Sequence, residues 1–328
     1  MLCRCEVKVE MTQLVDVKNA KEKIDRLIYE MEKTIYGKRE VIQLTVTALL
    51  AGGHVLFEDI PGVGKTMMIK TLAKAIMGDF NRIQLTPDLF PGDILGVSIF
   101  NSQTNEFEFR RGPIFTTLLL ADEINRTTPK TQSALLEAMS ENHVTIDNKT
   151  YELDEHFFVL ATQNPIEFEG TYPMPEAQLD RFLFRLKIGY PSFEDELNLM
   201  MDKKNHELIQ VEHVISHEEL TQLKQLVNQV YVGENVARYA LSLVSVTRSH
   251  PQIELGISPR GCLAFLKAAQ AFALTEGRDF VSPLDIQKVL PAAFRHRLLL
   301  SGNYSPTERQ LNKIIAEIIA AVNVPIGR

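Results

Sequence analysis

Short apolar runs alternate with longer segments of helical periodicity over much of the first 191 residues. Five of these runs are short enough for strands that are buried on both faces, and they cover residues 54–57, 82–85, 117–121, 157–161 and 184–188. Between the runs, apolar residues recur every three or four positions, as they do over 67–76. Strands joined by helical crossovers predict an α/β domain with a five-stranded parallel sheet and helices on both of its faces.

The residues outside these runs show helical periodicity without a buried strand signal. Before the first run, one helical face carries Ile24, Leu27, Ile28, Met31 and Ile35. Beyond Pro191, Ser216 to Glu219 has capping-box spacing, and three more helix starts with a Ser N-cap followed by Pro are indicated at Ser258, Ser282 and Ser305. The division that these patterns predict is a flexible N-terminus over 1–16, a core over 17–191 and a smaller all-α domain over 192–328.

Two segments inside the predicted core have the alternation of hairpins rather than of core strands. Residues 87–113 are punctuated by Pro and Gly, and their apolar residues alternate with polar ones. A second hairpin is predicted over 144–153, where two short alternating runs flank the turn Asp147-Asn148-Lys149. We therefore expect both segments to be insertions beside the sheet.

The segment Asp59-Ile60-Pro61-Gly62-Val63-Gly64-Lys65-Thr66 joins the first run to the helical segment after it. A strand, a glycine-rich turn and a helix start form a phosphate-binding loop. The amides from Gly62 to Thr66 would contact a β-phosphate, Lys65 would bridge the β- and γ-phosphates, and the Thr66 hydroxyl would bind Mg²⁺. Asp59 stands where the usual pattern has glycine, and Asp tolerates turn conformations well. The alternative is a chance Gly-Lys-Thr in an ordinary loop.

Two adjacent acids, Asp122 and Glu123, follow the third apolar run. The carboxyl ends of parallel strands meet at one edge of a sheet, so both acids would lie beside the phosphate-binding loop. Asp122 would hold Mg²⁺ through water, and Glu123 would orient and polarise the attacking water. A solvated pair at a strand end is the simpler alternative.

Three further polar residues are candidates for contact with a γ-phosphate. Asn164 follows the fourth run and could hydrogen-bond the attacking water, although Asn-Pro also favours a plain turn. Arg181 could reach a neighbouring subunit's phosphate, or it could pair locally with Asp180. Arg260 lies in the first turn of a predicted helix, where a cation opposes the helix dipole unless an anion is near.

The amino-acid composition excludes some classes of protein but indicates no particular ligand. With 328 residues, 45% hydrophobic and 23% charged, the chain has the profile of a soluble globular protein. A net charge of −7 disfavours a nucleic-acid-coating protein, and the apolar stretch 44–57 is too short to span a bilayer. Three cysteines and the lack of an apolar signal segment predict a cytoplasmic protein, with no role assigned to Cys3 and Cys5.

Taken in order, these motifs resemble those of the ring-forming AAA+ ATPases. The resemblance is closest to the MoxR family, through 58–66, 82–88, 121–126 and 161–165, and it covers about 36–297. It implies that Tyr36 and Gly37 lie near the adenine, that Asn164 is sensor 1, that Arg181 is a finger given in trans and that Arg260 is sensor 2, reaching the γ-phosphate from a helical lid. The nucleotide-binding set implied is Tyr36, Gly37, Gly62, Val63, Gly64, Lys65, Thr66 and Met67.

The resemblance also implies an activity and partners. Similar proteins are chaperone-like ATPases that use ATP and Mg²⁺, often form hexamers, and work with von Willebrand factor A domain proteins on a protein client; some are described as methanol dehydrogenase regulators. Two other classes stay open, a nucleic-acid-translocating motor and a scaffold that binds ATP without hydrolysing it. Arg126 and Arg185 remain alternatives to Arg181 as the finger.

Overall fold

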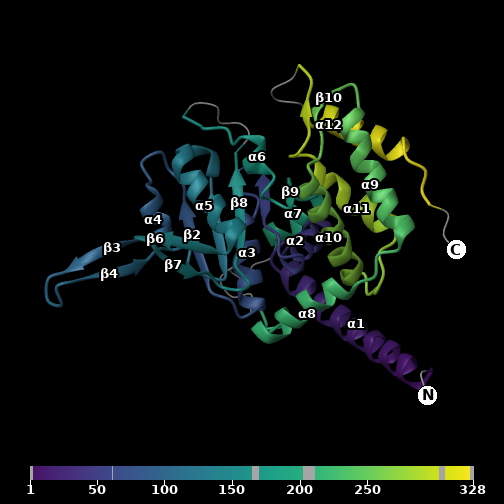
Figure 1. Ribbon diagram of the computed structural model, residues 1–328, viewed down its shortest axis with the longest axis horizontal. Coiled ribbons are helices and arrows are strands. Elements are labelled where there is room, and N and C mark those ends of the chain that lie inside the picture. Colours follow the sequence, from purple (N-terminus) through teal and green to yellow (C-terminus); the bar gives the residue numbers. More distant parts are fainter. Residues whose placement is uncertain (1–2, 61, 165–169, 202–210, 303–306, 326–328) are drawn as a thin grey trace.

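The computed structural model describes residues 3–60, 62–164, 170–201, 211–302 and 307–325 (Figure 1). Its centre is a five-stranded sheet whose strands are all parallel, in the order β2-β5-β8-β1-β9. The strands are β1 (Val55–Glu58), β2 (Phe80–Gln84), β5 (Leu118–Asp122), β8 (Phe158–Gln163) and β9 (Phe184–Leu186). The predicted sheet is thereby confirmed, and β2 and β9 form its edges.

Side chains that alternate along the strands bury both faces of this sheet. Phe57, Leu120 and Leu160 pack in a cluster with α1 (Cys3–Glu32), α2 (Arg39–Leu50) and α3 (Lys65–Ala75). Their strand neighbours Leu56 and Leu119 face the other way, into a second cluster that includes residues of α4 (Pro91–Leu95) and α5 (Pro129–Glu141). A strand places successive side chains on opposite faces, which is why near-continuous apolar runs are needed here.

Most of the segment 1–16 is helical in the structure, and the expectation that this segment is flexible stays a prediction. In the structure α1 already begins at Cys3 and continues to Glu32. No Gly or Pro occurs between Met1 and Tyr36, so the sequence has no residue that would end the helix earlier. From Val17 onward α1 buries one face against the core, and it extends away from the body toward its N-terminus (Figure 1).

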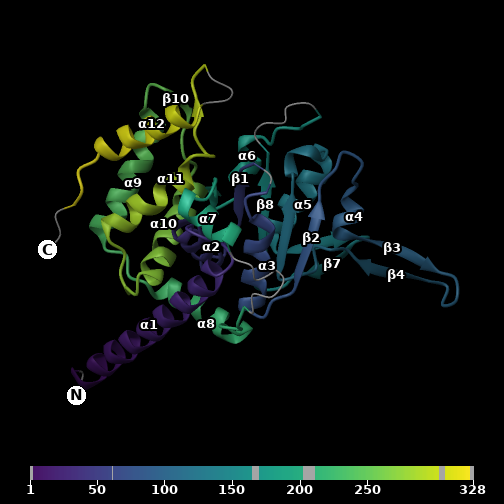
Figure 2. The same ribbon diagram turned by 180° about the vertical axis from the view of Figure 1, so that it is seen from behind.

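Both predicted hairpins are present beside the sheet. β3 (Gly96–Asn101) pairs with β4 (Glu106–Arg111), and this long hairpin projects from the body (Figure 2). β6 (His143–Ile146) pairs with β7 (Lys149–Glu152) around Asp147 and Asn148, whose φ angles are 50° and 61°. Positive φ at both central residues is the requirement of a type I′ turn.

Helices form most of the C-terminal part: α7 (Phe193–Met201), α8 (His217–Gln229), α9 (Glu234–Ser249), α10 (Pro259–Thr275), α11 (Pro283–Phe294) and α12 (Glu308–Ala320). A two-stranded ribbon of β10 (Ile253–Leu255) and β11 (Leu299–Leu300) accompanies them. Ser258 and Ser282 cap their helices as expected. α12 begins later than expected, because Thr307 forms its own capping box with Gln310; Ser305 lies outside the described residues.

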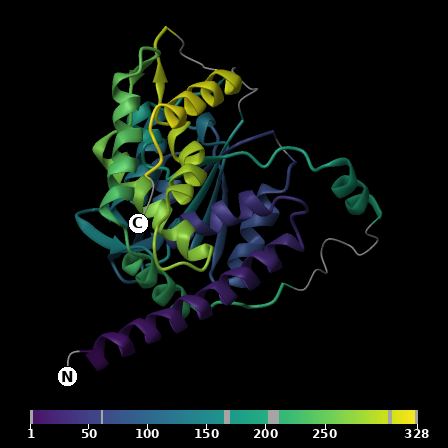
Figure 3. The same cartoon turned by 90° about the vertical axis from the view of Figure 1, so that its right-hand side faces the viewer.

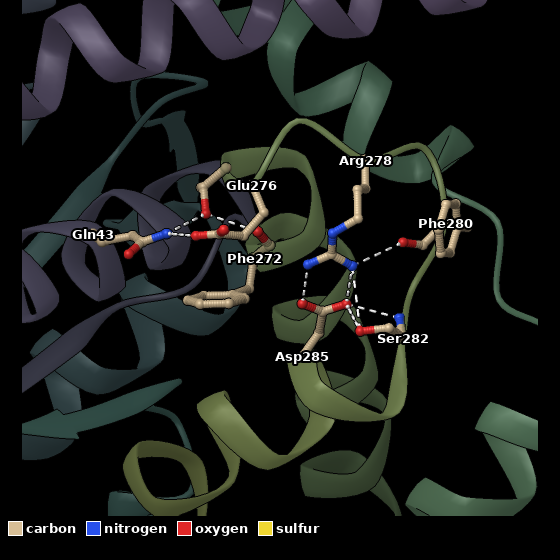
Figure 4. Close-up of polar contacts among 8 residues, drawn as sticks. Gln43, Phe272, Glu276, Arg278, Phe280, Ser282 and Asp285 are labelled. Atoms are coloured by element: carbon tan, nitrogen blue, oxygen red, sulfur yellow. Dashed lines mark hydrogen bonds and ion pairs between the residues drawn. The ribbon is translucent and has the colours of Figure 1, made fainter. Parts of the chain in front are cut away.

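The helical part packs closely on the core. Gln43 of α2 donates its side-chain amide to Thr275 Oγ1 (3.0 Å) and Glu276 Oε1 (2.6 Å) at the end of α10 (Figure 4). In the same view Arg278 forms a bidentate ion pair with the fully buried Asp285 of α11. These contacts fix the start of α11 beside the corner where α10 meets the core.

Candidate functional site

A cavity of about 390 Å³ lies where β1, β5 and β8 end. Of the residues predicted for a nucleotide site, it is lined by Gly62, Gly64, Lys65, Thr66, Met67, Asp122, Glu123 and Asn164. Gly62 and Gly64 have φ angles of 88° and 95°, a conformation that favours glycine, and α3 starts directly after them. The first-turn amides of α3 therefore open toward this cavity, as an anion site requires.

The Lys65 ammonium group lies over the loop itself. Its Nζ donates to the carbonyl oxygens of Asp59 (2.9 Å) and Ile60 (3.1 Å). Burial lowers the pKa of Lys65, while the charges of Asp59, Asp122 and Glu123 act in the opposite direction. A phosphate entering the cavity would give this cation a stronger partner than two neutral carbonyls.

Both acids of the predicted pair face the cavity, and each is held by a side chain of the edge strand β2. Arg82 Nε donates to Asp122 Oδ2 at 2.7 Å, and Gln84 Nε2 donates to Glu123 Oε2 at 2.7 Å. Arg126 Nη1 also pairs with Glu123, at 3.0 Å. Glu123 has a φ of 58°, so its backbone is in the left-handed region directly after β5.

Thr162 of β8 joins the two acids from the other side. Its hydroxyl donates to Asp122 Oδ1 (3.2 Å) and accepts from the backbone amide of Glu123 (2.9 Å). Asn164, two residues further, is buried and lines the same cavity. β5 and β8 are neighbouring strands, which is why residues distant in sequence meet here.

Arg82, Gln84 and Thr162 were not among the predicted site residues. Arg82 and Gln84 are two residues apart, so their side chains lie on the same face of β2. The register places Gln84 opposite Asp122 of β5. Period-two alternation was visible in the sequence, but only the strand order places this face beside the acids.

The oxygens around Thr66 and Asp122 suit a magnesium ion. Both residues line the same cavity, and Mg²⁺ prefers a few carboxylate or hydroxyl ligands together with phosphates and water. Among the residues that the structure describes, no cluster of three His, Cys, Asp or Glu could bind a metal by itself. The donor set therefore fits a metal that arrives with a nucleotide.

Arg181 and Arg260 do not line this cavity. They line a second one of about 200 Å³, together with Lys267 and Arg297. Arg181 Nε donates to Ser140 Oγ at 2.9 Å, and Arg260 Nη2 donates to the same oxygen at 3.4 Å. Arg260 is therefore apart from the residues that line the first cavity, and its assignment as sensor 2, reaching the γ-phosphate from the lid, stays a prediction.

Contacts at the start of α10 explain the position of Arg260. Ser258 Oγ donates to Asp180 Oδ2 at 3.0 Å, and Arg297 Nε pairs with Asp180 Oδ1 at 2.6 Å. The first turn of α10 is therefore held beside Arg181 rather than beside Lys65. The Asp180 carboxylate forms its ion pair with Arg297. The structure therefore does not show the local Asp180–Arg181 pair that was the alternative role of Arg181.

The alternative arginines have partners within their own chain. Arg185 of β9 forms an ion pair with Glu58 of β1, and Arg126 pairs with Glu123, which lines the first cavity. Tyr36 and Gly37 lie outside the residues that line that cavity, although the Ile35 side chain is next to Gly64. The assignment of Arg181 as the finger and of Tyr36 and Gly37 to an adenine stays a prediction.

A parallel sheet with this phosphate-binding loop and acidic pair, followed by a helical domain, defines a P-loop nucleotide-binding fold of the AAA type. Residues 54–184 match the model of the ATPase family associated with various cellular activities (AAA), and residues 245–318 match the AAA lid domain. These matches fall inside the predicted core and lid. The crystal structure of a Cytophaga hutchinsonii protein proposed to be an ATPase has 37% identity and a TM-score of 0.87, with 98% of this chain and 99% of that chain covered.

Proteins of similar sequence indicate the family to which the chain belongs within the AAA class. YeaC of Bacillus subtilis, an uncharacterised protein, is 51% identical over 93% of this chain and 96% of its own length. Chaperone MoxR1 of Mycobacterium tuberculosis is 39% identical over 92% of this chain and 82% of its own, and Protein MoxR of Paracoccus denitrificans is 28% identical over 89% and 93%. The chain belongs to the MoxR family of AAA+ ATPases. Within the described residues, no helix has the length and apolar character needed to cross a membrane.

Proposed function

We propose that this protein is a Mg²⁺-dependent ATPase that hydrolyses ATP to ADP and phosphate at sites shared between neighbouring subunits of a ring. The observation that carries the proposal is the cavity that gathers Lys65, Thr66, Asp122 and Glu123, with Arg181 and Arg260 gathered elsewhere. In this proposal one chain supplies the residues that bind ATP and activate the attacking water, and its Arg181 and Arg260 would act at the site of a neighbouring subunit.

The residues of the first cavity divide the work. The loop amides and Lys65 bind the phosphates, and Thr66 and Asp122 would hold a magnesium ion, which would neutralise charge on the phosphate oxygens. Glu123 would orient and polarise the attacking water, and Asn164 would hydrogen-bond it or the γ-phosphate. Before this, Glu123 must be released from Gln84 and Arg126, and Asp122 from Arg82.

Arg181 would enter the neighbouring subunit's site as a finger, and the position of Arg260 beside it supports the same destination for both. Both donate to Ser140 Oγ, so the two guanidinium groups lie close together. An arginine finger contributes about 10³–10⁵-fold to turnover in P-loop NTPases, mainly in the transition state. Hydrolysis would then depend on assembly, and a hexamer is the size that we propose.

The output that we propose is the remodelling or maturation of a protein client in the cytoplasm, in partnership with a von Willebrand factor A domain protein. A relative named as a chaperone supports this class. The net charge of −7 disfavours the nucleic-acid motor, and the presence of Glu123 in the cavity disfavours a scaffold that does not hydrolyse ATP.

The first test compares ATP turnover of the wild type with that of Glu123→Gln. We expect turnover to fall by about 100-fold or more while nucleotide binding is retained, since an amide cannot act as the base. Equal and negligible turnover in both proteins would favour the scaffold. Turnover that rises on adding DNA would favour the nucleic-acid motor.

The second test concerns the shared site. Arg181→Ala should lower turnover and leave ATP affinity within about threefold, because a finger acts in the transition state. Mixing it with Lys65→Ala subunits should restore activity, since each variant supplies the part that the other lacks. Failure to restore activity in a mixed ring that has assembled would refute the assignment of Arg181.

A further inference from the structure

Asp59, the residue that replaces glycine at the start of the phosphate-binding loop, has a carboxylate that accepts three backbone hydrogen bonds. Oδ1 accepts from the amide of Ile60 at 3.0 Å. Oδ2 accepts from the amides of Ile188 (2.6 Å) and Gly189 (2.7 Å), which follow β9 in the chain. Asp59 is only 8% exposed, and hydrogen bonds to an ionised acceptor are stronger than neutral ones.

The backbone of the same residue contacts the catalytic side of the site. The Asp59 carbonyl accepts from Lys65 Nζ at 2.9 Å, and its amide donates to Gln163 at the end of β8. One residue therefore joins the phosphate-binding lysine to the segment 188–190. The link from Lys65 is to a neutral carbonyl, whereas the link to the segment is charge-assisted, so a phosphate can displace the first and leave the second.

The segment 188–190 leads into α7, and α7 leads to the rest of the lid. Lys38 Nζ donates to the Tyr190 carbonyl at 2.6 Å, and Ser192 Oγ contacts Asp195 in the first turn of α7. Figure 3 shows α7, in teal, standing apart from the other helices of the lid. Phe193 and Met200 of α7 are each 80% exposed, whereas the Asp195 carboxylate lies against Gly37 of the core.

We propose that Asp59 is a positioning residue that connects occupancy of the phosphate-binding loop to the position of segment 188–190 and α7. The inference rests on the proposed function in one respect, the binding of a nucleotide phosphate by Lys65. When Lys65 turns from the Asp59 carbonyl to a phosphate, the loop's first peptides shift, and the carboxylate carries Ile188 and Gly189 with them. Glycine at this position would still form the turn, but it would have no carboxylate to make the connection.

A simpler role for Asp59 is to satisfy two buried amides without any dependence on nucleotide. The two roles differ in one observable. If Asp59 is only structural, its removal changes the amide hydrogen exchange of segment 188–190 equally with and without nucleotide. If it is a positioning residue, its removal abolishes the difference between the two states.

The experiment uses the full chain and measures amide hydrogen exchange over 186–201 with and without ATPγS. The variants are Asp59→Gly, which restores the usual loop pattern, and Asp59→Asn, which keeps the shape with a weaker acceptor. The control is Asp79→Asn, which removes the same charge from an exposed residue of the core. Fluorescent ADP titration gives nucleotide affinity, and steady-state turnover gives kcat and KM.

We expect wild type and Asp79→Asn to show the same nucleotide-dependent change in exchange. Asp59→Gly should lose that change while it binds ADP within about threefold of the wild type, and kcat should fall about tenfold with KM changed less than about threefold. Asp59→Asn should fall between them, and it carries the test if Asp59→Gly does not fold.

Two results refute the inference in distinguishable ways. A wild type that binds no nucleotide, with exchange unaffected by ATPγS, refutes the proposed function and the connection with it. A wild type that responds to ATPγS, together with Asp59 variants that respond to the same extent, refutes the connection alone.

Discussion

The ion pair between Asp180 and Arg297 joins the core to the lid, and its removal gives the sharpest stability prediction. Arg297 has a side chain that is 3% exposed, while that of Asp180 is 20% exposed, and their Oδ1 and Nε atoms are 2.6 Å apart. Burial lowers the pKa of Arg297, and the hydrogen bond that Arg297 donates to Asp180 opposes this change. Asp180→Ala would leave a buried guanidinium without its counter-charge.

The magnitude follows from burial and from the remaining partners. Removing one partner of a buried pair costs about 3–5 kcal/mol. Arg297 keeps hydrogen bonds to the carbonyls of Leu183 (3.0 Å) and Phe182 (2.7 Å), which favours the lower end. We therefore expect the free energy of unfolding to fall by about 3 kcal/mol, or about 100-fold in the folding equilibrium.

The measurement is urea unfolding followed by circular dichroism, with a matched pair as control. Glu234 and Arg238 of α9 also lie 2.6 Å apart, but their side chains are 78% and 75% exposed. Glu234→Ala should cost less than about 0.5 kcal/mol, because water screens an exposed pair. Equal losses in the two variants would refute the reasoning that burial, rather than distance, sets the value of the pair.

Two further predictions concern the cavity and pH. Arg82→Gln removes the cation that lies 2.7 Å from Asp122 and would compete there with the metal. The Mg²⁺ concentration for half-maximal turnover should therefore fall about threefold. An unchanged concentration would show that Arg82 does not compete with the metal. Burial lowers the pKa of His54 from 6.5 to about 4. Between these pH values the unfolded chain binds one more proton than the folded chain. The free energy of unfolding should therefore fall by about 3 kcal/mol as the pH falls from about 7 toward 4. His54→Gln should reduce the slope of unfolding free energy against pH by about one proton, measured by urea unfolding; a slope equal to that of the wild type would contradict this account.

Local patterns were sufficient for the sheet and for the loop. The five apolar runs fall on the five strands within a few residues, because strands buried on both faces need continuous apolar sequence. The loop from Gly62 to Thr66 lies at the cavity because its glycines and the helix start after it are consecutive in the chain. The second hairpin was visible from Asp147 and Asn148, which tolerate positive φ.

Features that depend on contacts distant in sequence were not predictable in the same way. Arg82 and Gln84 approach the acidic pair only because β2 neighbours β5. Arg260 lies beside Arg181 because Ser258 hydrogen-bonds Asp180, a contact between residues 78 positions apart. No periodicity within a segment reports which face of the core the lid will cover.

The position of β2 at the edge of the sheet has a consequence for how this chain can vary. An edge strand pairs on one side only, and a slip of one residue past its neighbour exchanges its two faces. Such a slip in β2 would turn Arg82 and Gln84 away from Asp122 and Glu123 together. Insertions or deletions in the hairpin that follows would leave this register unchanged. The insertion or deletion of a single residue within 80–84 would instead remove the contacts of Arg82 and Gln84 with both acids at once.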